Sequence, residues 1–171
     1  MAVNPNSPTT EPAEGESPYY TLETYSAEDS VGYLIASLRT RMFRVLDLEF
    51  AKFDFTAAQW PILRSVADGE TPTAADLCRR LNYDTGSMTR MLNRLEQKGV
   101  IVREPSAADR RVVQLKITPA GRKIHRKLRA ATIRVLNHLV RGFEPQEIHQ
   151  LHQQLLRMQA NLGAAYDHDA P

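Results

Sequence analysis

The segment from Thr73 to Gly99 constrains the fold most, because it encodes two short helices joined by a turn of three residues. Thr73 and Asp76 have the spacing of a capping box at the start of the first helix. Asp84 is a good N-cap for the second helix, and Gly99 is a typical stop. Apolar residues recur along this second helix at spacings of three and four: Met88, Met91, Leu92 and Leu95. Two short helices joined in this way are typical of a helix-turn-helix.

The hydrophobic period changes directly after this motif. Residues 100–102 are a short β-type run, and residues 113–117 alternate apolar with polar side chains. Residues 104–111 between them are polar and turn-rich, which predicts a hairpin with a long charged tip. We therefore expect a mainly α-helical chain with a small β-hairpin wing, a winged helix-turn-helix in its middle.

A further helix is expected just before the motif. Thr56 is positioned to cap it, Gln59 to reach back to the cap amide, and Phe55 to staple onto Trp60. Pro61 is expected to remove one early backbone hydrogen bond and to bend the first turn of this helix.

Longer helical patterns flank this lobe on both sides. Residues 29–52 form one amphipathic helix, and Pro119, after a capping Thr118, opens another that runs to about Arg141. Pro145 opens a last helix whose apolar residues follow the rhythm of a coiled-coil seam. Because so small a chain offers these seams no internal partner, a two-fold dimer is expected to bury them. The predicted dimerisation residues are Val31, Ile35, Leu38, Ile148, Leu151, Leu155, Met158 and Leu162.

These patterns divide the chain into one domain and two tails. Residues 1–28 hold four of the ten prolines, and their charged side chains are all acidic, so a flexible tail is expected there. The domain is expected over residues 29–165, with the winged-helix lobe at 55–118, dimerisation helices at 29–52 and 119–163, and a second tail at 166–171.

Composition and charge narrow the functional class. No apolar run approaches the roughly 20 residues of a membrane span, no signal peptide is recognisable, and the single cysteine excludes a disulfide framework, so a cytoplasmic protein is expected. Residues 73–129 carry fourteen basic and five acidic side chains, a net charge of +9, whereas the remainder carries −7. A basic centre between acidic flanks is expected of a nucleic-acid contact surface, although solvated helix faces would give the same charges.

The helix over residues 84–98 has a polar face opposite its apolar stripe. A recognition helix places its N-terminal residues in the major groove, where Gly86 would let the backbone approach and Ser87 would meet a base or a phosphate. Arg90 is long enough for a bidentate contact with guanine, and Arg94 is better placed for a phosphate. The alternative is an ordinary solvated helix face. The predicted DNA contacts on this helix are Thr85, Gly86, Ser87, Thr89, Arg90, Asn93 and Arg94.

Arg110 and Arg111 lie at the tip of the predicted hairpin, where a guanidinium could enter the adjacent minor groove. Asp109 beside them would repel DNA, so its expected role is to hold an arginine side chain extended through a bidentate ion pair. The alternative is a solvated turn that serves solubility.

Four stretches resemble the MarR family, the multiple-antibiotic-resistance regulators: residues 55–60, 84–99, 109–111 and 115–121. The resemblance covers roughly residues 29–162. Its wing motif, Asp-Arg-Arg followed by Leu-Lys-Ile-Thr-Pro-Ala-Gly, is specific, with Ile117 where leucine is more common.

This resemblance implies a homodimer that binds a pseudo-palindromic operator on double-stranded DNA. It also implies repression that a small ligand relieves, often a phenolic or other aromatic anion. The matching positions are the groove-reading Ser87, Arg90 and Arg94, the phosphate-contacting Thr73, the minor-groove Arg111 and the acid that positions it, Asp109.

The family binds its effectors between the dimer helices and the DNA-binding lobe. The aromatic or cationic residues expected near those junctions are Tyr33, Arg39, Trp60 and Arg103, although residues of these types are more often structural. Cys78 raises the alternative of a redox trigger, and a protein-interaction module without DNA is a second alternative. Neither a phosphate loop, nor a nucleophile elbow, nor a metal-ligand spacing is present, so neither an enzyme nor a cofactor is expected.

Overall fold

The computed structural model describes residues 19–69 and 72–166, apart from the side chains of residues 164–166. The chain forms two compact units. One unit is Ile35–Leu139, and the other combines the two ends of the chain, up to Leu34 and from Val140 onward.

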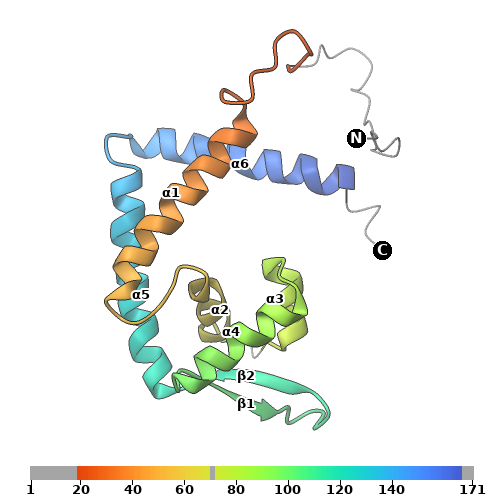
Figure 1. Cartoon of the computed structure of the whole chain (residues 1–171), viewed down its shortest axis with the longest axis vertical. Helices are drawn as coiled ribbons and strands as arrows, with labels where there is room; N and C mark the ends of the chain where they lie inside the picture. The colour runs from red at the N-terminus through yellow and green to blue at the C-terminus, as the bar shows by residue number, and fades with distance from the viewer. Residues whose placement is uncertain (1–18, 70–71, 167–171) are drawn as a thin grey trace. The chain divides into compact units, whose positions relative to one another are not determined.

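The unit Ile35–Leu139 carries the helix-turn-helix and the hairpin (Figure 1). β1 pairs with β2 in an antiparallel hairpin, in which Ile101 faces Ile117 and Pro105 faces Val113. The predicted fold class, mainly α-helical with a winged helix-turn-helix, is confirmed. The elements in chain order are α1 (Val31–Ala51), which begins in the other unit, α2 (Gln59–Ala67), α3 (Ala74–Leu81), α4 (Thr85–Gln97), β1 (Ile101–Pro105), β2 (Val113–Ile117) and α5 (Pro119–Leu139).

One buried cluster holds this unit together and fixes the orientation of α4. Met88, Leu92 and Leu95 of α4 are fully buried, as the apolar stripe predicts, and Met91 is partly buried. Burying one side chain of this size contributes about 1.5–3 kcal/mol. α4 is therefore attached to the lobe along one face, and its other face is left exposed. The cluster also includes Phe50 of α1, Ile62 and Leu63 of α2, Leu77 of α3 and Leu128 of α5.

The capping residues act as their spacing predicts. Thr73 and Asp76 form the capping box of α3: the Thr73 hydroxyl accepts from the Asp76 N–H at 3.2 Å, and the Asp76 carboxylate accepts from the Thr73 N–H at 2.9 Å. Asp84 caps α4 with its side chain. Gly99 has a φ of 67°, the left-handed conformation that suits glycine after a helix end.

The start of α2 differs from the prediction. α2 begins at Gln59 and no side chain caps it, so the prediction that Thr56 caps this helix was wrong. Gln59 does reach back as predicted, since its Oε1 accepts from the Thr56 N–H at 3.1 Å. Asp47 of α1 accepts from the Ala57 N–H at 2.6 Å and so satisfies an amide of the entering turn. Pro61 lies within the first turn of α2, where a backbone N–H has no partner inside the helix, so the expected loss of a hydrogen bond does not arise.

The hairpin is joined closely to the elements on both sides of it. The Leu115 N–H donates to the Pro72 carbonyl at 2.9 Å, which ties β2 to the segment before α3. A methyl group at Gly121 would lie 2.0 Å from the Val100 carbonyl oxygen and 2.8 Å from the Ile117 side chain. Only glycine therefore lets α5 start this close to the root of the hairpin.

The unit formed by the chain ends contains α6 (Pro145–Tyr166) and the residues that precede α1. The Tyr20 hydroxyl accepts from the Val31 N–H at 3.0 Å, in the first turn of α1. The Tyr20 ring contacts Tyr19 and Tyr25 edge to face, with centroids 4.9 and 6.1 Å apart. Of the predicted tail over residues 1–28, the last ten residues thus make local contacts, and residues 1–18 lie outside the described residues.

A membrane span would need a longer or more apolar helix than any among the described residues.

Candidate nucleic-acid interface

The exposed face of α4 carries all seven residues that the sequence assigns to DNA contact on this helix. Six of them are exposed and Ser87 is half-buried. They lie opposite the buried stripe that contains Met88 and Leu92, so the packing of the lobe presents them together as one polar surface.

Arg90 is held at the first turn of α4. Its Nη2 donates to Ser87 Oγ at 2.9 Å. Ser87 donates its backbone N–H to the Asp84 carboxylate at 2.8 Å. Hydrogen bonding from Ser87 holds the pKa of Asp84 below its ordinary value, and the nearby charge of Arg90 adds to the effect. Asp84, Ser87 and Arg90 therefore form one connected network on the exposed face.

Arg103 of β1 joins the hairpin to α4. Its Nη1 lies 2.7 Å from the Glu96 carboxylate, and its Nη2 donates to Asn93 Oδ1 at 2.9 Å. The Asn93 amide oxygen is thus engaged by the protein. Arg103, which we expected near an effector pocket, instead lies beside the recognition helix, where it fixes the hairpin root relative to α4.

Asp109 shapes the tip of the wing through the backbone. Its carboxylate accepts from the Arg111 N–H at 2.9 Å, which closes a local turn. This is not the predicted contact, an ion pair with an arginine side chain. Within residues 19–69 and 72–166, no acidic side chain pairs with Arg110 or Arg111, and both are exposed. The wing tip therefore carries two available guanidinium groups on a turn that Asp109 closes.

The Thr73 hydroxyl, which the family resemblance assigns to phosphate contact, is occupied by the cap of α3. It donates to the Asp76 carboxylate at 2.7 Å and accepts from the Asp76 N–H. The hydrogen bonds from the Thr73 hydroxyl and the Thr73 N–H, together with the Arg79 guanidinium 2.5 Å away, lower the pKa of Asp76 to about 2. Cys78, further along α3, is half-buried and packs against the core cluster.

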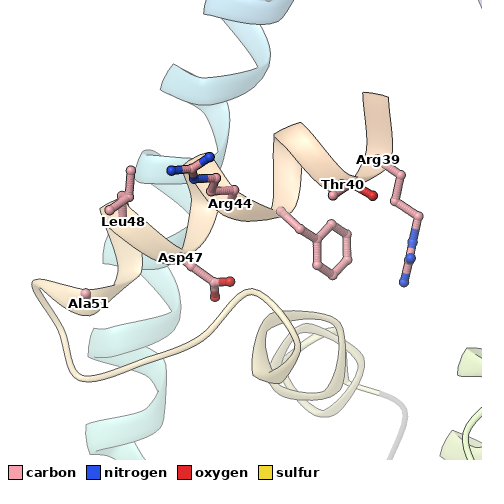
Figure 2. A pocket seen from close by; sticks show the side chains of 7 residues that line it. Arg39, Thr40, Arg44, Asp47, Leu48 and Ala51 are labelled. Atoms are coloured by element: carbon pink, nitrogen blue, oxygen red, sulfur yellow. The ribbon is translucent and has the colours of Figure 1, made fainter. Parts of the chain in front are cut away.

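Within the unit Ile35–Leu139, the residues predicted to hold an effector do not gather in one place. Arg39 lies on α1, with its guanidinium 4.8 Å from the centroid of the Phe43 ring. It lines a hollow whose lining residues all come from α1. In Figure 2, Arg39 and Asp47 point to one side of this helix, and Arg44 and Leu48 point to the other. This hollow is therefore an open surface of one helix.

Trp60 lines a different cavity of about 340 Å³, between α2 and α5. The His125 ring stacks on Trp60 with centroids 5.2 Å apart. The charged groups of the lining are Arg64, Arg129 and Asp68, so cationic side chains outnumber the single carboxylate. Tyr33, the remaining candidate, is exposed in the unit formed by the chain ends.

His125 is a candidate that the sequence reasoning missed. Burial lowers its pKa, Asp68 opposes this, and the charges of Arg129 and Arg64 favour the neutral ring further. Its Nε2 atom is buried and has no hydrogen-bond partner among the described residues. The signal was present in the sequence, because His125 lies three residues before the buried Leu128 and so falls on the inward stripe of α5.

The segment that contains the helix-turn-helix and the first strand of the hairpin is similar to known proteins. The profile of the MarR family matches residues 53–112, from the entry to α2 as far as the wing. The multiple antibiotic resistance protein MarR of Salmonella typhimurium is 37% identical over 94 residues, which are 55% of this chain and 65% of that protein. The predicted resemblance to the MarR family is confirmed. The match spans a little less than two thirds of the length of these curated MarR relatives.

Solved structures extend the likeness to MarR beyond the matched segment. A variant of Escherichia coli MarR in complex with operator DNA is 28% identical, with a TM-score of 0.70 over 79% of this chain and 99% of that chain. The Staphylococcus aureus MepR–DNA complex, 23% identical, has the same fold, with a TM-score of 0.72 over 80% of this chain and 99% of that chain. Since the MarR relatives are regulators, the prediction that the chain is not an enzyme is also confirmed.

Proposed function

We propose that this chain is a MarR-type transcription regulator, a homodimeric repressor that binds a pseudo-palindromic operator. The observation that carries the proposal is the exposed polar face of α4, with Arg90 held at its first turn and a wing whose Arg110 and Arg111 are exposed. The likeness to an Escherichia coli MarR variant bound to operator DNA supports it. A protein of this kind would act on DNA in the cytoplasm.

Within this proposal, the two arginines of α4 have different roles. Arg90 lies in the second turn of α4, and its guanidinium reaches back to Ser87 in the first turn. A recognition helix directs its N-terminal end at the base edges, where an arginine can read guanine. Arg94, one turn later and exposed, is placed to contact a phosphate, which orients the protein without specifying sequence.

A binding titration separates these roles. The wild-type chain is used to select duplexes from a random pool, and affinities for the selected and a scrambled duplex are measured at several salt concentrations. Arg90→Ala is expected to cost about 1–3 kcal/mol on the selected duplex and to relax its base preference. Arg94→Ala is expected to weaken both duplexes alike and to flatten the salt dependence. A wild-type chain that binds no duplex even at low salt would contradict the proposed function and favour a protein-interaction module.

The proposed dimer rests on exposed apolar side chains at both ends of the chain. Val31, Ile35 and Leu38 are exposed on α1. On α6, Leu151, Leu155, Met158 and Leu162 are exposed at coiled-coil spacing. A second copy would bury both stripes and place two α4 helices for successive major grooves, about 34 Å apart.

We propose the cavity beside Trp60 as the site through which a small aromatic or phenolic anion relieves repression. The Trp60 and His125 rings offer a stacking surface, and Arg64 and Arg129 offer cationic groups. A cavity of about 340 Å³ suits a single-ring ligand.

Trp60 is the single tryptophan of the chain, so its fluorescence reports directly on this cavity. Titration with hydroxybenzoates is expected to change the emission of the wild-type chain and to weaken its binding to the selected duplex. The double variant Arg64→Ala and Arg129→Ala should lose both responses. If saturating hydroxybenzoate leaves the affinity for the selected duplex unchanged, hydroxybenzoates are excluded as effectors. The proposal that the chain binds DNA would not be affected.

A further inference from the structure

We infer that Ser87 is a positioning residue: it holds Arg90 in its reading position and so sets base preference without itself contacting DNA. This inference rests on the proposed function. It replaces the direct contact with a base or a phosphate that we predicted for Ser87.

The hydrogen bonds around Ser87 run in one direction, from Arg90 to the helix cap. Arg90 Nη2 donates to Ser87 Oγ at 2.9 Å, and the Ser87 N–H donates to the Asp84 carboxylate at 2.8 Å. The Ser87 hydroxyl oxygen is therefore already engaged by the Arg90 guanidinium. Ser87 is also half-buried, whereas Arg90 is exposed. The group that is available to a duplex is thus the guanidinium.

Gly86 lies beside the Arg90 guanidinium and the Asp84 carboxylate. A methyl group at Gly86 would lie 3.5 Å from Arg90 Nη1 and 3.3 Å from Asp84 Oδ1. The guanidinium therefore lies back against the first turn of α4, over the one residue of that turn that has no side chain. A guanidinium has five N–H donors, so the single bond to Ser87 leaves both terminal nitrogens with a donor for a base.

Holding Arg90 in advance reduces the entropy that binding would otherwise cost. Ordering one long side chain at an interface weakens binding by about twofold to tenfold, and this loss is avoided when the side chain is already fixed. Arg94 provides the contrast within the same helix, because no side chain among the described residues fixes its exposed guanidinium. Arg90 is therefore suited to selecting a base, and Arg94 to contacting the phosphates of the DNA backbone.

A double-mutant cycle on the full-length chain tests this inference. Affinities of wild type, Ser87→Ala, Arg90→Ala and the double variant are measured on the duplex that the wild type selects from a random pool. Ser87→Ala is expected to weaken binding by about twofold to tenfold per half-site, and to change binding to a scrambled duplex much less. In the Arg90→Ala background, Ser87→Ala should cause no further loss, because it acts through the missing side chain.

Two comparisons make the outcome decisive. Ser87→Thr keeps the hydroxyl and should retain most of the affinity, which a merely structural role of the small side chain would not predict. Three outcomes would each overturn the positioning role: additive losses in the cycle, equal losses on both duplexes, or no loss from Ser87→Ala. In each of these cases the wild-type chain still binds its selected duplex, so the proposed function stands. A wild-type chain that selects no duplex would contradict the proposed function itself.

Discussion

Single side chains decide where the helices of the DNA-binding lobe begin, and each does so by satisfying a backbone amide that the helix leaves unpaired. Asp76 in α3 and Asp84 before α4 accept such bonds through their carboxylates. The ionised carboxylate accepts these bonds more strongly than the protonated acid does, so the caps connect the stability of the lobe to pH.

Asp76 gives the first prediction. Its pKa in the folded chain is about 2, against 3.8 for an ordinary aspartate, so the ionised form is favoured by folding. A carboxyl group with a lowered pKa contributes stability that is complete above its unfolded pKa and is lost as the pH falls toward its folded pKa. Wild type is therefore expected to melt at a higher temperature than Asp76→Asn at neutral pH, and the difference should disappear between about pH 4 and pH 2. A difference that stays constant or grows in acid would contradict this account of the cap.

Gly121 gives the second prediction, which concerns shape rather than charge. A methyl group there meets the Val100 carbonyl oxygen at 2.0 Å, so α5 or the hairpin root must move. Gly121→Ala is expected to lower the free energy of unfolding by about 1–3 kcal/mol in a denaturant titration. Gly32→Ala is the matched control, because nothing lies within 4 Å of the added carbon, and it should cause no loss. Equal stability of the two variants would show that the root of the hairpin is not tightly packed.

At the scale of elements, one set of side-chain contacts joins the wing to α4. Arg103 makes these contacts from β1 to Glu96 and Asn93. The neighbouring pair between Lys116 and Glu104, 2.8 Å apart, stays within the hairpin. The two pairs therefore differ in whether they cross from one element to another.

This difference gives the third prediction. Arg103→Met should loosen the wing against α4 and weaken binding to the selected duplex several-fold. Its effect on unfolding should be small, about 0.5–1 kcal/mol, because the pair is partly exposed. Lys116→Met removes a partly exposed pair of similar length and serves as the control for lost charge. The same loss of affinity in both variants, measured at one salt concentration, would show that charge alone matters.

The elements that could be predicted from sequence are those whose determinants are local. The box from Thr73 to Asp76, the cap at Asp84 and the buried stripe of α4 all depend on residues within one or two turns of each other. The start of α2 could not be predicted in this way, because Asp47 of the preceding helix, ten residues before Ala57, accepts a bond from an amide of the turn that enters α2.

The residues of the site that could be predicted from sequence are likewise those whose position depends on one helix alone. Every predicted DNA contact on α4 lies on its polar face, since helical period alone places them there. The contact of Arg103 with Asn93 joins β1 to α4, and the sequence around either residue does not predict it. The stacking of His125 on Trp60 joins α2 to α5. The one signal for it in the sequence is that His125 falls on the apolar stripe of α5.

At the scale of the whole molecule, the proposed dimer gives the fourth prediction. Leu151 and Leu155 are exposed on α6 at positions that a second copy would cover. The double variant Leu151→Glu and Leu155→Glu is expected to behave as a monomer of about 19.3 kDa in sedimentation, and to bind the selected duplex weakly, because each monomer then reaches one half-site. Gln153→Glu, on the opposite side of α6 by helical spacing, adds charge without touching the seam and should remain dimeric. A wild-type chain that sediments as a monomer would contradict the dimer.

Methylation interference tests most directly the proposal that α4 reads the major groove, because methylated guanine N7 lies in that groove. On the duplex that the wild type selects, methylation should block binding at two groups of guanines about one helical turn apart, related by the symmetry of the dimer. Arg90→Ala should bind less tightly and should lose the interference at both positions. Interference that persists unchanged without Arg90, or a wild-type chain that shifts no duplex at low salt, would contradict the account.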